Sequence, residues 1–161
     1  MKSASFRDYI ELPRQVSETC EIALGSDSAP RQELRDHGWN LIDPLIVTRN
    51  TWSYQQYIHH SKAEFSVAKH GYVLSHCGWF SERSACYLAA GRPVITQDTG
   101  FGCSLPTGDG LFAFSTMEEI VSSFDAINSN YEKHSKAAGE IANEYFKAET
   151  VLEKLLHDLG A

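Results

Sequence analysis

The densest group of residues able to do chemistry lies in the stretch HCGWFSERSA, residues 76–85. It combines a histidine, a glutamate and an arginine with Gly78 and the hydroxyls of Ser81 and Ser84. Glycine lets a ligand approach the backbone closely, and unpaired N–H groups at the start of a helix attract anions. This composition therefore suits the binding of a phosphate group. A plain turn followed by a helix, with no ligand, is the alternative that the pattern also allows.

A phosphate site of this kind needs a helix that begins at Ser81 and a strand before the loop. Serine is a favoured N-cap, apolar residues follow it at helical spacing, and Gly91 ends the run. The runs AEFSVAK and YVLSHCG, divided by a His-Gly pair, predict a turn and then a strand at residues 72–75. The first N–H groups of a helix have no internal partner and carry the positive end of its dipole. We therefore expect the loop at 76–81 to attract an anion.

Strand and helix patterns alternate along the rest of the chain. Strands are predicted at 20–24, 39–47 (interrupted by Pro44), 92–100 and 110–114, and helices at 28–38, 53–62, 115–127 and, once or twice, within 131–159. The helix at 115–127 begins with a capping box from Thr116 to Glu119. This order predicts an α/β fold, a parallel sheet with helices on both faces. Ligands of such sheets bind at the carboxyl ends of the strands.

Length and charge limit the function classes. The 161 residues suit one domain spanning 1–161, and 42% of them are hydrophobic, which is ordinary for a folded chain. No run approaches the roughly 20 apolar residues of a membrane span. The first 15 residues contain no apolar signal segment, so we expect a cytoplasmic location. The net charge of −7, without a basic stripe, argues against nucleic acid as a partner.

The histidines and cysteines do not form a recognisable site. His59, His60, His70 and His76 fit no tetrahedral metal spacing, and no DxD sequence occurs, so no metal is expected. The four cysteines include no CxxC pair, which predicts free and mostly buried thiols.

Two further groups of polar residues remain ambiguous. Asp98, with Thr99 and Gly100 after it, ends the strand PVITQD, where its carboxylate either contacts a sugar hydroxyl or caps the next turn. Glu64 and Lys69 form either a pair that faces a ligand or an exposed ion pair.

Taken together, these motifs resemble the C-terminal, nucleotide-sugar-binding domain of GT-B fold glycosyltransferases over residues 17–157. The run HCGWFS at 76–81 is similar to the HCGWNS core of the UDP-glycosyltransferase signature, with Phe80 in place of asparagine. The run SACYLAAGRPVITQDTGF at 84–101 is similar to the EAMAxGxPVI stretch of the retaining branch, and GDGLFAFSTMEEI at 108–120 to the strand and helix after it.

The resemblance implies a Rossmann-like sheet, one half of a GT-B fold, that binds a nucleotide-diphosphate sugar as substrate without a cofactor. It assigns the diphosphate to His76, Gly78, Trp79, Phe80, Ser81 and Arg83, and the donor sugar to Asp98, Thr99 and Gly100. Transfer would proceed without a metal to an acceptor that the sequence does not identify. The alternatives are a non-catalytic nucleotide- or sugar-phosphate-binding module and a protein-interaction module.

Two features depart from the family pattern. The two glutamates of the retaining branch fall here on Gly78 and Cys86, so we assign the ribose to Glu82, one helical turn before Cys86. The chain also has room for only one of the two GT-B domains. The resemblance therefore predicts that an N-terminal acceptor domain or a partner chain supplies the other half, and that this chain alone shows little transfer.

Overall fold

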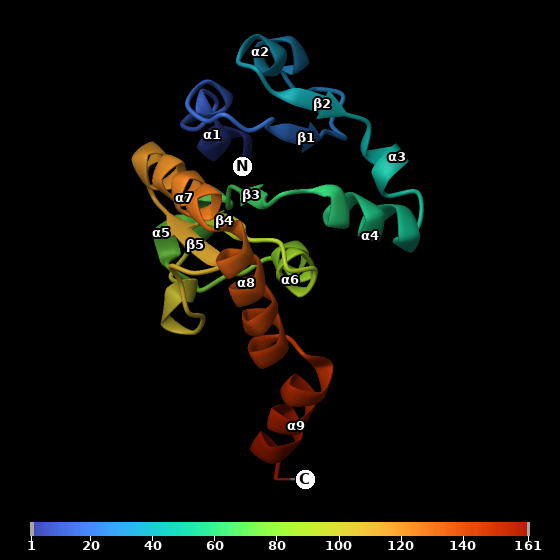
Figure 1. Ribbon diagram of the computed structural model, residues 1–161, viewed down its shortest axis with the longest axis vertical. Helices are drawn as coiled ribbons and strands as arrows, with labels where there is room; N and C mark the ends of the chain where they lie inside the picture. Colours follow the sequence, from blue (N-terminus) through green and yellow to red (C-terminus); the bar gives the residue numbers. More distant parts are fainter. Residues whose placement is uncertain (1, 161) are drawn as a thin grey trace.

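The strands lie in two parallel sheets in the computed structural model, which describes the backbone of residues 2–160 and the side chains of residues 5–160. The larger sheet has the order β3-β4-β5, formed by Glu64–Ser66, Val94–Gln97 and Leu111–Phe114. The smaller joins β1, Glu21–Ala23, to β2, Asn40–Ile42. Every pair is parallel, which confirms a mixed α/β fold, although the strands are divided between two sheets (Figure 1).

Helices connect the strands. Their bounds are α1 Lys2–Arg7, η1 Leu12–Arg14, α2 Arg31–Asp36, α3 Pro44–Val47, α4 Thr51–His60, α5 His70–Ser75, α6 Glu82–Ala89, η2 Phe101–Cys103, α7 Met117–Ser129, α8 Tyr131–Tyr145 and α9 Ala148–Asp158. The predicted capping box of α7 is present, since Thr116 Oγ1 accepts from the Glu119 N–H at 3.3 Å. The segment after β2 begins a helix because Pro44 stands at its first position and Asp43 caps it.

The strand predicted at residues 72–75 is wrong. These residues belong to helix α5, and the strand before α6 is β3, at Glu64–Ser66. A short apolar run fits a strand or a helix equally well, so only tertiary packing decides between them. Leu74 is exposed, whereas Glu64 and Ser66 are buried beside β4, so the earlier run holds the position in the sheet.

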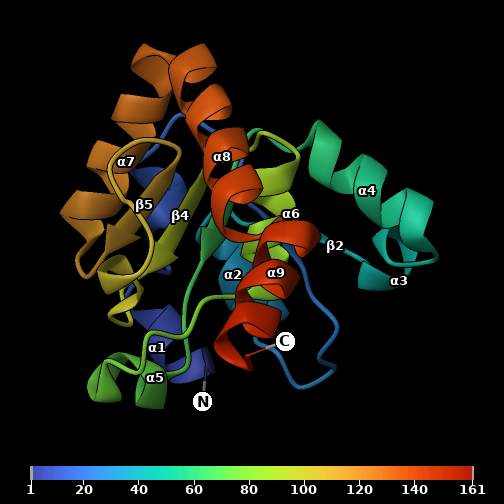
Figure 2. The ribbon, with the colours of Figure 1, turned by 90° about the horizontal axis from the view of Figure 1, so that it is seen from below.

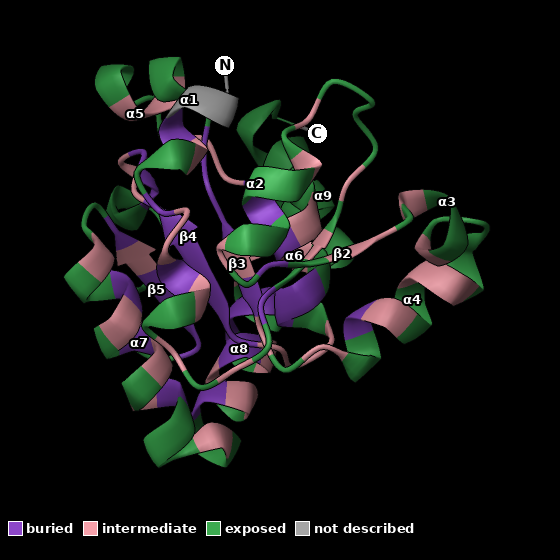
Figure 3. Ribbon diagram, turned by 90° about the horizontal axis from the view of Figure 1, so that it is seen from above, coloured by how far each residue is buried: buried purple, intermediate pink, exposed green. Residues whose placement is uncertain are grey.

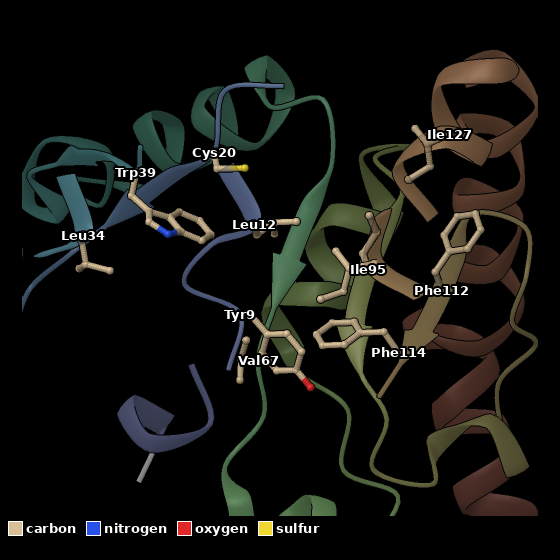
Figure 4. Close-up of a cluster of buried hydrophobic side chains, with 11 residues drawn as sticks. Tyr9, Leu12, Cys20, Leu34, Trp39, Val67, Ile95, Phe112, Phe114 and Ile127 are labelled. Atoms are coloured by element: carbon tan, nitrogen blue, oxygen red, sulfur yellow. The ribbon is translucent and has the colours of Figure 1, made fainter. Parts of the chain in front are cut away.

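The two faces of the larger sheet carry separate hydrophobic clusters. Ile95 and Phe112 pack with Ile120 and Ile127 of α7 on one face, and Figure 4 shows Tyr9 and Trp39 in the same cluster. Val94 and Leu111 face the other way and pack with residues of α6 and α8. In Figure 2, β4 and β5 lie between α7 and α6, and in Figure 3 both strands are buried over most of their length. Helices thus cover both faces, as predicted.

Candidate functional site

The predicted phosphate loop lies at the carboxyl end of the larger sheet. Residues 76–81 lead from α5 into α6, the helix that crosses from β3 to β4. Gly78 donates its N–H to the carbonyl of Thr99 at 2.7 Å, and Thr99 Oγ1 donates to the carbonyl of Trp79 at 2.6 Å. Thr99 follows β4 by two residues. The structure therefore brings the loop at 76–81 against the turn at 98–100.

Left-handed backbone conformations shape this junction. His76 ends α5 with φ 44°, and its side chain is exposed. Gly78 and Gly100 follow with φ 74° and 86°, which glycine adopts without strain. A Cβ on Gly100 would lie 3.0 Å from the His76 carbonyl oxygen, so glycine permits the close approach of the two segments.

The first turn of α6 keeps some N–H groups free. Ser81 is its N-cap, is 6% exposed, and accepts the Arg83 N–H at 3.3 Å on its Oγ. The N–H groups of Glu82 and Ser84 have no hydrogen-bond partner among the described residues. The hydroxyl of Ser84 is fully buried and also unpartnered within residues 5–160. One N–H of the turn is therefore occupied by the protein, and the N–H of the exposed Glu82 can bind an anion, whereas that of Ser84 lies in a residue that solvent does not reach.

Arg83 points toward β3. Its Nε donates to Glu64 Oε1 at 2.5 Å, and its Nη2 donates to Ser66 Oγ at 2.9 Å. Burial lowers the pKa of Arg83, but the Glu64 carboxylate more than offsets this, so the net pKa is raised. The structure thus attaches this guanidinium to the sheet, with its charge already compensated.

The suggested pairing of Glu64 with Lys69 is wrong in both of its forms. Glu64 is buried, its Oε1 is held by Arg83, and its Oε2 has no partner in the described part of the chain. Lys69 is exposed and lies 5.4 Å from the centre of the Tyr72 ring. The two residues diverge because Glu64 belongs to β3, whereas Lys69 is the N-cap of α5.

The turn after β4 is held together by its own side chains. Asp98 accepts the Gly100 N–H at 2.8 Å, so its carboxylate caps the turn, the second of its two predicted roles. Thr99 is fully buried and its hydroxyl is committed to Trp79. Only the exposed parts of Asp98 and Gly100 are available to a ligand at this turn.

The aromatic residues of the loop face the protein. The Phe80 ring lies 5.4 Å from the centres of the Phe101 and Phe146 rings, and Trp79 stacks on Tyr72 at 5.1 Å. Phe80 is half-buried by these contacts, so its ring serves the packing of the loop first. Glu82, by contrast, is exposed at the first position of α6.

A group of tyrosines around the Glu64–Arg83 pair was not predicted. Tyr54 of α4 and Tyr87 of α6 lie within electrostatic reach of both charges, and burial is the main cause that raises the pKa of each phenol. Tyr87 contacts Ser61 at 3.5 Å between their hydroxyl oxygens. The glutamate inside an otherwise apolar run was the only sequence signal for this cluster.

Three of the four cysteines contradict the prediction of buried thiols. Cys77, Cys86 and Cys103 are exposed, and only Cys20 is buried. All four are free. Burial, with a smaller contribution from Glu18, raises the pKa of the Cys20 thiol to about 11, so this thiol stays protonated.

Within residues 2–160, no group of three or more His, Cys, Asp or Glu side chains is placed to hold a metal ion. Over the same residues, no helix has the length and apolar character needed to cross a membrane. No family model, curated protein or solved structure matches the chain.

Proposed function

We propose that this chain is the donor-binding module of a GT-B glycosyltransferase. The start of α6 would hold the diphosphate of a nucleotide sugar, Glu82 would contact the ribose, and the turn at 98–100 would lie beside the donor sugar. The acceptor site would come from an N-terminal domain or a partner chain.

One observation carries the proposal. The loop at 76–81 and the turn at 98–100 are joined by two hydrogen bonds at the carboxyl edge of a parallel sheet, next to the exposed and unpartnered N–H group of Glu82. Ligands of parallel α/β sheets bind at this edge, and helix starts bind phosphates there.

The proposed chemistry is the stabilisation of a departing diphosphate. As the bond between sugar and diphosphate breaks, negative charge grows on the leaving oxygen. Fixed N–H dipoles stabilise that charge without reorganising, which is the usual source of the largest catalytic contribution in such sites. The N–H group of Glu82, at the exposed first position of α6, is the donor that this turn would supply.

Calorimetric titration of the full chain with UDP, GDP, dTDP and their sugars tests binding. Gly78→Ala places a methyl group on the loop at φ 74° without a clash inside the protein, so it should weaken binding at least 10-fold. Gly160→Ala, after α9, also places a methyl group at φ 74° in open space, so it carries the same kind of backbone strain and serves as the matched control with unchanged affinity. Equal affinities of the two variants, or no binding of any of these nucleotides by the wild type, would contradict the proposal.

A non-catalytic nucleotide- or sugar-phosphate-binding module is the second candidate. The observation that favours it is the Arg83–Glu64 pair, because a compensated guanidinium adds little to the stabilisation of a leaving group. Release of nucleoside diphosphate from the nucleotide sugar, measured with the acceptor half supplied, separates the two. Binding without release supports the module.

A further inference from the structure

Helix α9 carries an apolar face that the described chain leaves uncovered. Val151, Leu152, Leu155, Leu156 and Leu159 recur at helical spacing and are between 47% and 73% exposed. No described residue of α9 is buried, and Figure 1 shows the helix projecting beyond α8, away from both sheets. Amphipathic helices normally bury such a face, so this stripe is suited to contact with a partner surface.

The same chain offers a concave surface along α6, which we call the α6 groove. Between α6 and α8 lies a hollow of about 310 Å³, and between α6 and α4 a second of about 550 Å³. Cys86 and Ala89 line both, so the two hollows meet along the helix. The other lining residues include the small Ala85, Gly139 and Ala142 and the larger apolar Trp52 and Ile58, with polar side chains such as Gln55, Asn143 and Lys147 among them. Small side chains leave the space that projecting leucines fill in helix packing.

We propose that the chain forms a two-fold dimer in which α9 of each copy lies in the α6 groove of the other. The exchange is reciprocal, so one dimer contains two α9–groove contacts. Both halves of the contact are on one chain, which is the condition for a self-complementary interface.

The buried area favours this exchange over the pairing of two α9 stripes. At about 100 Å² for a fully exposed branched side chain, one stripe presents roughly 300 Å² of apolar surface. Two stripes in contact would bury roughly 600 Å² of apolar surface, counting both copies. Two α9–groove contacts would bury roughly 1,200 Å², twice as much, and by that area alone exceed the roughly 1,000 Å² in total that a specific interface needs.

The charges of α9 argue against a lipid surface as its partner. Within the helix, Glu149, Glu153 and Asp158 outnumber Lys154, the one lysine there. Anionic membranes attract basic amphipathic helices and repel acidic ones. A protein surface therefore fits this helix better than a membrane does.

Analytical ultracentrifugation of the full chain at micromolar concentrations tests the proposal. We expect a dimer that Leu155→Glu, on α9, and Ala89→Arg, in the α6 groove, each weaken at least 10-fold. Both residues are exposed, so neither variant should disturb the fold, which circular dichroism verifies. Glu153→Gln, on the same helix but outside the stripe, is the matched control and should leave the dimer intact.

Mixing the two defective variants gives the decisive measurement. Each variant alone lacks both contacts, whereas the mixed dimer keeps one intact contact, between α9 of the Ala89→Arg copy and the groove of the Leu155→Glu copy. The mixture should therefore dimerise more strongly than either variant. A monomeric wild type, as expected if α9 folds onto its own chain or binds another protein, would overturn the proposal. A dimer that Ala89→Arg leaves unchanged, as expected for paired α9 stripes, would overturn it too.

Discussion

Replacing Arg83 by methionine should destabilise the protein more than replacing Glu64 by glutamine. The two side chains form one ion pair, but Glu64 is 5% exposed and Arg83 is 42% exposed. Methionine keeps the length of the arginine stem and removes its charge, so the buried carboxylate loses its charged partner. Glutamine leaves a guanidinium that water still reaches.

The size of each loss in unfolding free energy follows from this difference in exposure between Glu64 and Arg83. Removing one partner of a fully buried pair costs about 3–5 kcal/mol, and the exposure of Arg83 reduces this to about 3 kcal/mol. For a chain of this size, that loss lowers Tm by about 6–12 °C. Glu64→Gln keeps an acceptor for Arg83, so we expect a loss of about 1 kcal/mol.

The assay is denaturant unfolding of both single variants and of the double variant at pH 7. The double variant should be less unstable than the sum of the single losses, because the pair is lost only once. The reasoning fails if Glu64→Gln is the more damaging change, or if the two single losses add in full in the double variant.

Substitutions at Gly110 and Phe80, with Gly139 as a control position, test the packing that positions the site. Gly110→Ala should cost at least about 3 kcal/mol of unfolding free energy, because Gly110 has φ 74° and a Cβ there would overlap the backbone of Ala138. Gly139→Ala meets open space and should instead stabilise the protein by up to about 1 kcal/mol. Phe80→Ala should cost about 2–3 kcal/mol, below the usual range for a phenylalanine because the ring is only half-buried, and Phe80→Leu should cost less. Guanidinium unfolding checks both, and a tolerated Gly110→Ala would contradict the close approach of β5 to α8.

The local elements with strong end signals were predictable from the sequence. The capping box placed α7, and Ser81 with Gly91 placed α6. The helical structure of residues 72–75 was not predictable. Nothing in a three-residue apolar run distinguishes a helix such as α5 from a strand. The division of the strands between two sheets depends on long-range packing, which local periodicity does not encode.

Only part of the candidate site was predictable, because local sequence signals place its loops but not their long-range partners. The meeting of residues 76–81 with 98–100 follows from two loops at the same edge of a parallel sheet. The position of Arg83 could not be predicted in this way. Its partner Glu64 lies in β3, whereas the sequence analysis placed the strand before α6 at residues 72–75. Because the strand before α6 was placed wrongly, the neutralisation of the Arg83 charge by Glu64 was missed as well.

These contacts give the groups in the first turn of α6 different roles. Ser81 caps the turn and Arg83 is attached to β3, so the hydroxyl and the guanidinium that could have bound a ligand serve the fold instead. What the turn leaves for an anion is the N–H group of the exposed Glu82. The proposed phosphate site therefore depends on the orientation of a helix, which the Arg83–Glu64 pair helps to fix. This explains how an acidic chain could hold an anion without a cluster of lysines or arginines.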